Sequence, residues 1–481
     1  MREGSVTSDS WGGGGPPQRP PEPSPRPATG LRGVVWALVA LLFVRLTLAN
    51  GLGILADEAY YWTWSRVPAA GYFDHPPAVA WLIAASARLL GDTVLGVRAA
   101  CVLAGGLAAA VLVPRAREPG LLLLLLGGLP LFALGGIFAT PDVPLLLGWA
   151  VALAAALKGR WTLAGVGVGV ACLGKLTGWG LWPLLLVGAP REARRMVPGM
   201  ALTLAIAAPN LAWLARHDLV SLRFQLGHGL GAISGGPLRE PPGIAGAATF
   251  VAAQAGLVGP VLFLAAVAWM AVGWRGDREA RLLWWTSAPV LGFFAFAATR
   301  AHGEANWAAP AWLGACVALA RAGGRLGRAA WVGGGVGALL SGVVLLHAWV
   351  PLGAFPNDPV SRLGEAEDLA QSVSAWGVPV VYTERYQEAA LLRFHTGLDA
   401  WALPGAGRPD QFDLWTPPAA ERALFVRPWR GGPALPSDAV CTDRGPSHDV
   451  LERGRAGEVV ERWQVVEVGG CAPGRPGGTA P

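Results

Sequence analysis

A series of apolar runs between residues 34 and 349 constrains the fold more than any other feature of the sequence. Hydrophobic residues make up 53% of the chain and charged residues only 15%, whereas a soluble domain carries about 25% charged residues. A helix that crosses a bilayer needs about 20 apolar residues, within a range of about 17–25. The runs lie at 34–50, 94–113, 120–139, 142–157, 161–174, 178–190, 197–214, 248–273, 282–298, 307–320 and 329–349. They predict an α-helical polytopic membrane protein with about 11 spans, several of them short for a full crossing.

The cationic residues between these runs are clustered in every second loop. Membrane proteins carry their excess of Lys and Arg in cytoplasmic loops, so this alternation predicts that the clusters face the cytoplasm. The clusters are Arg115 and Arg117, Lys158 and Arg160, Arg191, Arg194 and Arg195, Arg275, Arg278 and Arg281, and Arg321, Arg325 and Arg328. With the N-terminus inside, an odd number of spans places the C-terminal residues outside. The net charge of +6 therefore reflects membrane topology, and we expect no nucleic-acid partner.

Composition separates an N-terminal tail from the membrane domain. Residues 1–30 are rich in Gly, Pro, Ser and Arg and cannot bury a core, so they are predicted to be a disordered cytoplasmic tail. Residues 31–350 form the predicted transmembrane catalytic domain, whose first outer loop is 51–93. Within that loop, the apolar segment 77–90 is too short to span comfortably and is predicted to be an interfacial or re-entrant helix.

The composition becomes that of a soluble protein after the last apolar run. Residues 378–382 are typical of a strand, 384–396 of a helix and 458–468 of another strand. We therefore predict a small extracytoplasmic α/β domain at 351–468 and a disordered Gly-Pro tail at 469–481.

The five cysteines fall into two groups. Cys101, Cys172 and Cys316 lie in apolar runs, where cysteine behaves as a small hydrophobe. Cys441 and Cys471 lie in the outer part of the chain, where an oxidising compartment permits a disulfide. The sequence leaves open whether these two residues pair.

Acidic side chains are concentrated in the loop that follows the first apolar run. Asp57 and Glu58 are adjacent carboxylates beside an aromatic band, and Asp74 and His75 follow in the same loop. Ionisable groups at a membrane interface are costly, and they mark chemistry or transport more often than packing. This loop is therefore the predicted active site. The structural alternatives are a helix N-cap for Asp57, a structural acid for Glu58, and a turn before two prolines for Asp74 and His75.

The sequence resembles a known family over roughly residues 31–415. The matching segments are 57–62, 71–77, 140–144, 174–177, 224–229, 304–307 and 386–390. They are similar to motifs of bacterial membrane glycosyltransferases that use polyprenyl-phosphate sugars. These enzymes belong to the C-type superfamily, with the protein O-mannosyltransferases and the lipid A aminoarabinose transferases as relatives. The resemblance implies a C-type glycosyltransferase fold in a multi-pass protein of the bacterial inner membrane.

One motif departs from that family. This chain has Asp74-His75-Pro76 where the aminoarabinose transferases carry an acid-Lys-Pro sequence, and the Lys there is implied to contact the lipid phosphate. Histidine supplies a matching positive charge only when it is protonated. The departure puts this phosphate contact, or the substrate itself, in question.

The resemblance implies an enzyme that moves a sugar from a polyprenyl phosphate to a hydroxyl of an envelope acceptor. The acceptor is lipid A, a polysaccharide or a protein, at the outer face of the inner membrane. Such a transfer needs a carboxylate that deprotonates the acceptor and cations around the leaving phosphate. Asp57 is expected to be the base of an inverting reaction, because a helix N-terminus keeps an acid ionised. Asp74 is expected to assist as a second acid.

The remaining candidates are expected to bind the substrates. They are Glu58, His75, Asp142, Lys175, Arg223, His228, Arg300, His302, Glu304 and Asn306. Lys175 is the main candidate for the phosphate, because it stands alone between two apolar runs on the outer side. The structural alternatives are a helix cap for Asp142, snorkelling to the interface for Lys175, and ordinary solvated positions for the loop residues. Arg45, within the first run, is expected to form a structural ion pair.

A metal and two other functions remain open from the sequence. Asp57, Asp74, His75 and Asp142 would together suit a divalent metal, although no ligand spacing indicates one. A secondary transporter also uses intramembrane acids and cations, but it places them near the midplane of repeated halves, and no repeat is evident here. A non-catalytic assembly partner would bind another protein through its outer domain.

Overall fold

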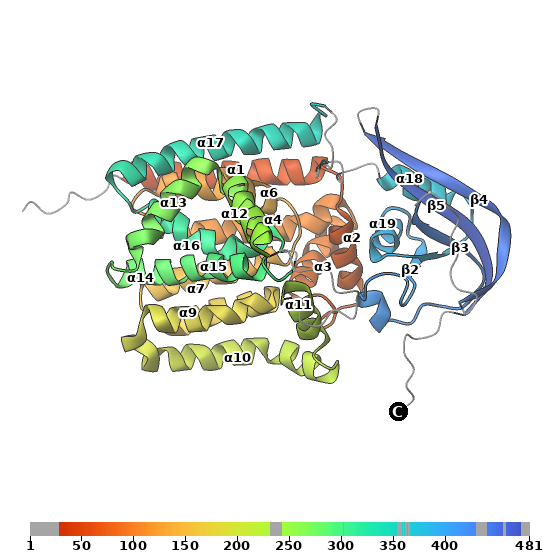
Figure 1. The fold of residues 1–481 in the computed structure, drawn as a ribbon, viewed down its shortest axis with the longest axis horizontal. Helices are drawn as coiled ribbons and strands as arrows, with labels where there is room; N and C mark the ends of the chain where they lie inside the picture. The colour runs from red at the N-terminus through yellow and green to blue at the C-terminus, as the bar shows by residue number, and fades with distance from the viewer. Residues whose placement is uncertain are drawn as a thin grey trace, which may run out of the picture.

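The computed structural model describes residues 28–230, 243–301, 303–353, 358, 360, 363, 366–429, 440–455 and 458–472. A helical body makes up the larger part, and a smaller sheet domain packs against one end of it (Figure 1). The helices of the body are α1 (Ala28–Gly51), α2 (Ala56–Arg66), α3 (Ala78–Leu90), α4 (Val94–Leu112), α5 (Pro119–Gly128), α6 (Pro130–Gly135), α7 (Asp142–Leu157), α8 (Trp161–Gly174), α9 (Leu181–Gly188), α10 (Ala193–Arg216), α11 (Val220–Leu230), α12 (Gly243–Val258), α13 (Pro260–Gly273), α14 (Arg278–Trp285), α15 (Ala288–Ala297), α16 (Ala309–Leu319) and α17 (Gly324–Trp349).

The length and composition of the helices are those of a multi-pass membrane protein. Within the described ranges, four helices are long and apolar enough to cross a membrane without a partner. They are Arg32–Gly51, Val94–Arg115, Pro190–Arg216 and Gly324–Trp349. The other apolar runs form shorter helices or bent pairs, so the count of about 11 spans stays a prediction.

Proline divides two apolar runs that the sequence predicts as single spans. Helices α12 and α13 meet at an angle of 113°. The break lies at Gly259-Pro260, where Gly259 has φ +81° and Pro260 has no N–H to continue the helix. The run at 120–139 is divided in the same way between α5 and α6, at Pro130. Periodicity does not show such breaks, because each half remains apolar.

Arg45 stabilises the break between α5 and α6 from its buried position in α1. Its Nη2 donates to the carbonyl oxygens of Leu126 at 2.9 Å and Phe132 at 2.7 Å. In a continuous helix the Leu126 carbonyl would accept from residue 130, and Pro130 has no N–H to donate. Arg45 therefore satisfies backbone carbonyls, and the ion pair expected from the sequence is replaced by these contacts.

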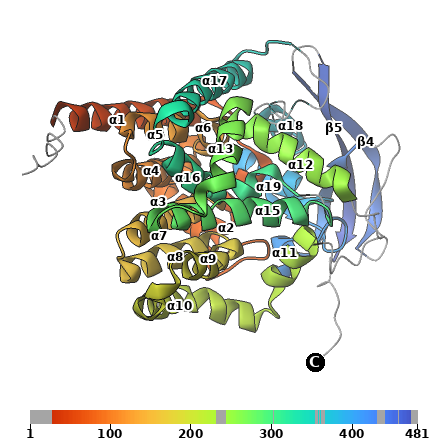
Figure 2. The same cartoon turned by 60° about the vertical axis from the view of Figure 1, so that its left-hand side comes forward.

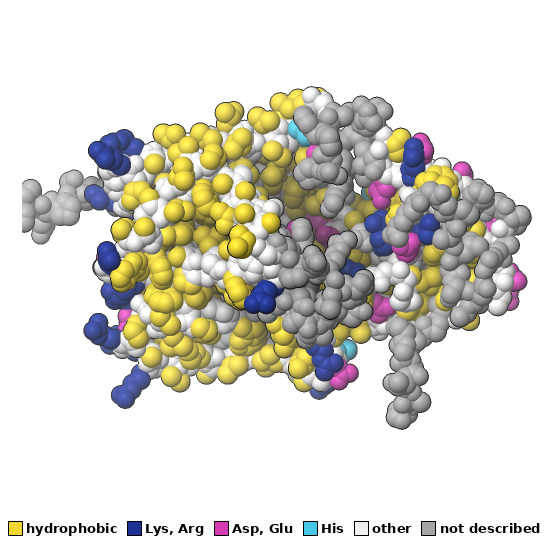
Figure 3. Space-filling view, in the orientation of Figure 1, with side chains coloured by type: hydrophobic (Ala, Val, Ile, Leu, Met, Phe, Trp, Pro, Cys, Tyr) yellow, Lys and Arg dark blue, Asp and Glu magenta, His cyan; other side chains and the backbone are white. Residues whose placement is uncertain are grey.

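The five cationic clusters lie together at one end of the helical body. Arg278 binds Glu192 and the carbonyl groups at the end of α7, so it joins three of the cationic loops. Arg321 binds Glu279 and the carbonyl of Arg115, which brings in the other two. Lys and Arg side chains gather at this end, remote from the sheet domain (Figure 3). The cationic loops that alternate along the sequence are thus brought together at one end of the fold.

The sheet domain is the small α/β domain that the composition predicts. Its elements are α18 (Ala366–Ser374), β1 (Val380–Thr383), α19 (Tyr386–Thr396), β2 (Asp399–Ala402), β3 (Ala420–Pro428), β4 (Cys441–Arg455) and β5 (Glu458–Cys471). The strand order is β2-β1-β3-β5-β4, with β1 parallel to β2 and β3, and with β5 antiparallel to β3 and β4. Strand β5 extends to Cys471, past residue 469, where the sequence predicts the start of the tail.

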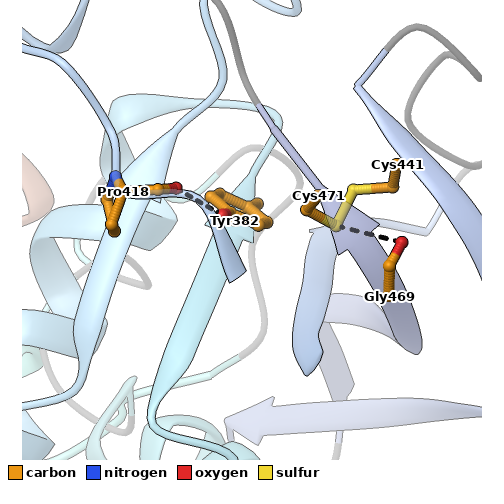
Figure 4. The surroundings of a disulfide bond; sticks show 5 residues. All are labelled: Tyr382, Pro418, Cys441, Gly469 and Cys471. Carbon is orange, nitrogen blue, oxygen red and sulfur yellow. Dashed lines mark hydrogen bonds between the residues drawn. A yellow bond between two sulfur atoms is a disulfide. The ribbon is translucent and has the colours of Figure 1, made fainter. Parts of the chain in front are cut away.

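A disulfide joins two neighbouring strands of this sheet, β4 and β5. Cys441 at the start of β4 and Cys471 at the end of β5 are directly opposite in the strand register, and their sulfur atoms are bonded (Figure 4). The sequence left this pairing open, because only the antiparallel pairing of β4 and β5 brings the two residues together.

Helix α19 of the sheet domain packs against α2 of the body, and both views show the two helices side by side (Figure 1, Figure 2). The rings of Tyr60 and Tyr386 lie 4.3 Å apart, and those of Trp62 and Phe394 lie 5.2 Å apart. One continuous cluster of buried side chains crosses this interface. The sheet domain is therefore fixed above the loop that holds the predicted acids.

Candidate active site

The first turn of α2 directs two adjacent acids into different environments. Glu58 is fully buried and accepts hydrogen bonds from Nε and Nη2 of Arg98, at 2.8 and 2.5 Å. It also accepts from the backbone N–H groups of Leu55 and Ala139. These contacts hold the start of α2 against α4. They support the structural alternative for Glu58, because its carboxylate has no exposed surface for a substrate.

Asp57, one residue earlier, is exposed. Its Oδ1 accepts a hydrogen bond from the hydroxyl of Tyr386 at 2.9 Å. Burial, and next the negative charge of Asp57, raise the pKa of Tyr386, so the phenol stays protonated and remains a donor. Asp57 is thus an accessible carboxylate that is oriented by the sheet domain.

Asp74 is buried, and both of its carboxylate oxygens are bound. Oδ1 pairs with Nη1 of Arg408 at 2.7 Å, and Oδ2 accepts from the hydroxyl of Tyr60 at 2.8 Å. That hydroxyl in turn accepts from the N–H of Gln411 at 2.6 Å. Burial raises the pKa of Asp74, while Arg408 and the Tyr60 hydrogen bond oppose this shift. The carboxylate therefore joins the outer loop to the sheet domain.

The loop around Asp74 is held from its other side by α11. Nε2 of Gln225 donates to the carbonyl of Asp74 at 2.8 Å and lies 3.4 Å from Nδ1 of His75. The hydroxyl of Ser221 donates to the carbonyl of Tyr72 at 2.6 Å. The sequence predicted an outer loop here, whereas the structure shows helix α11, which supports the loop that carries Asp74.

A second cluster brings together three predicted residues from distant parts of the sequence. Asp142, the first residue of α7, accepts from Nζ of Lys175 on Oδ1 and from Nδ2 of Asn306 on Oδ2, both at 2.7 Å. Gly174 allows this approach, because a Cβ there would lie 2.5 Å from the backbone of α7. The ammonium of Lys175 can donate three hydrogen bonds. Asp142 thus fixes the position of a cation that can also bind an anion.

An apolar cavity of about 300 Å³ includes Ala305, the residue that precedes Asn306 in the chain. It is lined by Ala245, Gly246, Thr249, Phe250, Ala253, Ala298, Ala301, Gly303 and Ala305. Nε2 of Gln254 donates to the carbonyl of Ala305 at 2.8 Å and anchors the turn that carries Asn306. The apolar lining suits a hydrocarbon chain.

The remaining predicted residues lie at the surface or outside the described part of the chain. Arg223, Arg300 and Glu304 are exposed. The side chain of His228 and the whole of His302 lie outside the described residues. Among the residues that the structure describes, no three His, Cys, Asp or Glu side chains are grouped so that they could hold a metal ion. The geometry therefore gives the divalent-metal interpretation no support.

Sequence reasoning did not identify Tyr386 and Arg408 as site residues. In the sequence, 329 positions separate Tyr386 from Asp57, and the sole signal for Tyr386 was its place in the stretch 386–390 that resembles the family. Arg408 is one of 38 Lys and Arg residues and has no distinguishing pattern around it. Only the docking of the sheet domain on α2 reveals both contacts.

Comparison with known proteins agrees with these observations. The family model described as dolichyl-phosphate-mannose-protein mannosyltransferase matches residues 74–213. Lipid A galacturonosyltransferase RgtD from Rhizobium johnstonii is 33% identical over 305 residues, which cover 58% of this chain and 61% of that protein. The chain thus aligns with less than two thirds of this relative.

The fold is similar to that of ArnT from Cupriavidus metallidurans. The apo structure of ArnT superposes with a TM-score of 0.59 at 18% identity, covering 92% of this chain and 98% of ArnT. The structure of ArnT bound to undecaprenyl phosphate gives a TM-score of 0.60 at 17% identity, with coverage of 92% and 99%. At this identity the comparison establishes a shared fold. With the family model and the relative, it confirms the resemblance that the motifs predicted.

Proposed function

From this confirmed resemblance to membrane glycosyltransferases that use polyprenyl-phosphate sugars, we propose that the protein moves a sugar from a polyprenyl phosphate to a hydroxyl of an envelope acceptor. The name of the relative RgtD supports lipid A as the acceptor and a uronic acid as the first sugar to test. The complex of ArnT with undecaprenyl phosphate supports a polyprenyl phosphate as the carrier. A polysaccharide or a protein is the alternative acceptor.

The contrast between the two loop carboxylates carries the proposal. Asp57 is exposed, and its Oδ1 accepts a hydrogen bond from the hydroxyl of Tyr386, whereas Asp74 is buried with both oxygens bound. A general base must reach the proton that it removes. Asp57 is therefore the base that deprotonates the acceptor hydroxyl, and Asp74 holds the loop in place. Attack from the face opposite the leaving phosphate inverts the configuration of the sugar.

The cluster of Asp142, Lys175 and Asn306 is the proposed site for the donor phosphate. Negative charge develops on the phosphate as the bond to the sugar breaks, and a fixed cation stabilises that charge. Asp142 and Asn306 orient Lys175, and the apolar cavity beside Ala305 receives the first isoprene units.

The site is proposed to lie at the outer face of the inner membrane. The cationic clusters gather at the opposite end of the body, and positive loops stay in the cytoplasm. The Cys441–Cys471 disulfide supports an oxidising compartment for the sheet domain. This orientation agrees with about 11 spans and an extracytoplasmic C-terminal domain.

Replacing the carboxylate of Asp57 tests the proposed function. Purified Asp57→Asn protein should transfer no uronic acid from undecaprenyl phosphate to lipid A, as followed by mass spectrometry, while its expression and membrane insertion match wild type. Asp277→Asn is the matched control, because Asp277 caps α14 at the cationic end and Asn also serves as an N-cap. Turnover by Asp57→Asn at the wild-type rate would refute the assignment. Mass spectrometry of envelope lipids and proteins from a deletion strain identifies the natural sugar and acceptor.

A further inference from the structure

Polar side chains of the sheet domain, Tyr386 and Arg408 among them, contact the candidate active site. Helix α19 lies against α2 (Figure 2), and the packing of Tyr60 on Tyr386 and of Trp62 on Phe394 is apolar. Tyr386 and Arg408 differ from the other side chains of this interface, because their polar atoms are directed at the two acids of the outer loop.

Tyr386 controls the orientation of Asp57. Its ring is buried against Tyr60, and its hydroxyl donates to Oδ1 of Asp57 at 2.9 Å. A phenylalanine ring would fill the same space, so packing alone does not require the hydroxyl. A donor on one carboxylate oxygen stabilises the ionised form and restricts the rotation of the group.

Arg408 joins three segments at one point. Its Nη1 pairs with Asp74 at 2.7 Å, and its guanidinium lies 4.5 Å from the ring centre of Tyr386 and 5.1 Å from that of Phe224 in α11. The same guanidinium thus contacts the outer loop, the helix that buttresses it, and the tyrosine that orients Asp57. Arg408 therefore contacts Asp74 directly and Asp57 indirectly, through Tyr386.

We propose that Tyr386 and Arg408 are positioning residues, by which the sheet domain sets the geometry of the two acids and becomes part of the active site. Tyr386 presents Asp57 to the acceptor hydroxyl, and Arg408 fixes Asp74 and the adjoining Tyr386 ring. This inference rests on the proposed function, since it assigns a catalytic consequence to contacts around the base.

The Tyr386→Phe variant removes one oxygen atom and keeps the ring. A hydrogen bond to a charged group contributes about 1.5–3 kcal/mol, so kcat should fall about 10- to 100-fold, with KM for undecaprenyl-phosphate-linked sugar within about twofold of wild type. Tyr382→Phe is the matched control. Tyr382 is a buried tyrosine of the same sheet, and its hydroxyl donates to the carbonyl of Pro418, away from the acids (Figure 4). Its kcat should remain at the wild-type value.

Two substitutions at position 408 separate charge from packing. Arg408→Lys keeps the positive charge beside Asp74 and should retain more of kcat than Arg408→Gln. Arg422→Gln is the control, because Arg422 is an exposed arginine that pairs with Glu467 on the same sheet. Its kcat should match wild type.

The outcomes distinguish this inference from the proposed function. Wild-type transfer together with unchanged kcat in Tyr386→Phe and in Arg408→Gln would overturn the inference and leave the function standing. A lower thermal midpoint with unchanged kcat would show packing alone, and would overturn it too. If the wild-type protein transfers no sugar, the proposed function fails first, and the inference with it.

Discussion

Lys175 donates a hydrogen bond to Asp142 at 2.7 Å, in a buried contact between the end of α8 and the start of α7. Neither element alone creates a site, because each residue stands singly at the end of an apolar helix. The close approach permitted by Gly174 makes them a pair, and Asn306 binds the second oxygen of the acid. This pair is the most direct target for tests of donor binding.

Removing either member of this pair should impair both catalysis and folding. Loss of one partner from a buried ion pair costs about 3–5 kcal/mol of folding stability. Loss of one fixed group that stabilises developing charge lowers kcat by about 100- to 1,000-fold, so Lys175→Met and Asp142→Asn should each reduce transfer by at least about 100-fold. The double variant should be little worse than either single variant, because the interaction is already lost. Initial rates of transfer give the coupling energy. Lys158→Met, at an exposed position in a cationic loop, is the control. Additive effects of Lys175→Met and Asp142→Asn on the rate of transfer would contradict the pairing.

Glu58→Gln should destabilise the protein, in contrast to the substitution of its neighbour. Glu58 is fully buried with Arg98, whose guanidinium also donates to the carbonyls of Ala49, Leu52 and Gly53. The variant leaves the Arg98 charge uncompensated in the interior, at a cost of about 3–5 kcal/mol. The thermal midpoint in detergent should fall, whereas exposed Asp57→Asn should unfold like wild type. Equal midpoints for both variants would argue against a structural role for Glu58.

The stability of the sheet domain should decrease between pH 5 and pH 8 because of Glu388. Burial raises the pKa of this acid to about 7, although Arg385 opposes the shift. A raised pKa means that the folded state favours protonated Glu388. The stabilising contribution of protonated Glu388 is therefore fully present below the pKa that this acid has in the unfolded state. It is lost as the pH rises through the pKa of the folded state, about 7. The loss is roughly 3 kcal/mol for a shift of this size.

Substitution isolates that contribution from other titrating groups. Glu388→Gln does not titrate, so its free energy of unfolding should fall less between pH 5 and pH 8 than that of wild type. Chemical unfolding followed by tryptophan fluorescence at both pH values gives the difference. Glu367→Gln, exposed on α18, should keep the wild-type slope. If the free energy of unfolding of Glu388→Gln changed with pH as it does in wild type, Glu388 would be excluded as the cause of the pH dependence.

The disulfide between Cys441 and Cys471 should report the compartment of the sheet domain. In whole cells, a maleimide reagent should label neither residue until a reductant is added, if the domain is extracytoplasmic. The bond closes a loop of 30 residues, and its removal in Cys441→Ser should lower the stability of the domain by about 3–4 kcal/mol. Labelling of native cells without a reductant would contradict the proposed topology. The buried Cys101, Cys172 and Cys316 serve as internal controls.

Local patterns were sufficient for several elements. The short helix predicted at 77–90 is α3 at Ala78–Leu90, and the helix predicted at 384–396 is α19 at Tyr386–Thr396. In both, composition and turn residues within one segment determine the element. The breaks in the apolar runs were missed, because the two sides of Pro130 and of Pro260 are equally apolar.

The sequence by itself determined that the chain is a membrane protein, which loops share a face, and that acids lie at the start of the helix after the first apolar run. These features depend on hydropathy, on the alternation of charge and on motifs, all of which act within a few residues of each other. The tertiary structure alone decided that Glu58 is used for folding and that Asp57 stays accessible. It also decided that Tyr386 and Arg408 approach the acids. A hydrogen bond or ion pair depends on distances of a few ångströms in space. Residues more than 300 positions apart acquire such distances only when the sheet domain docks on α2.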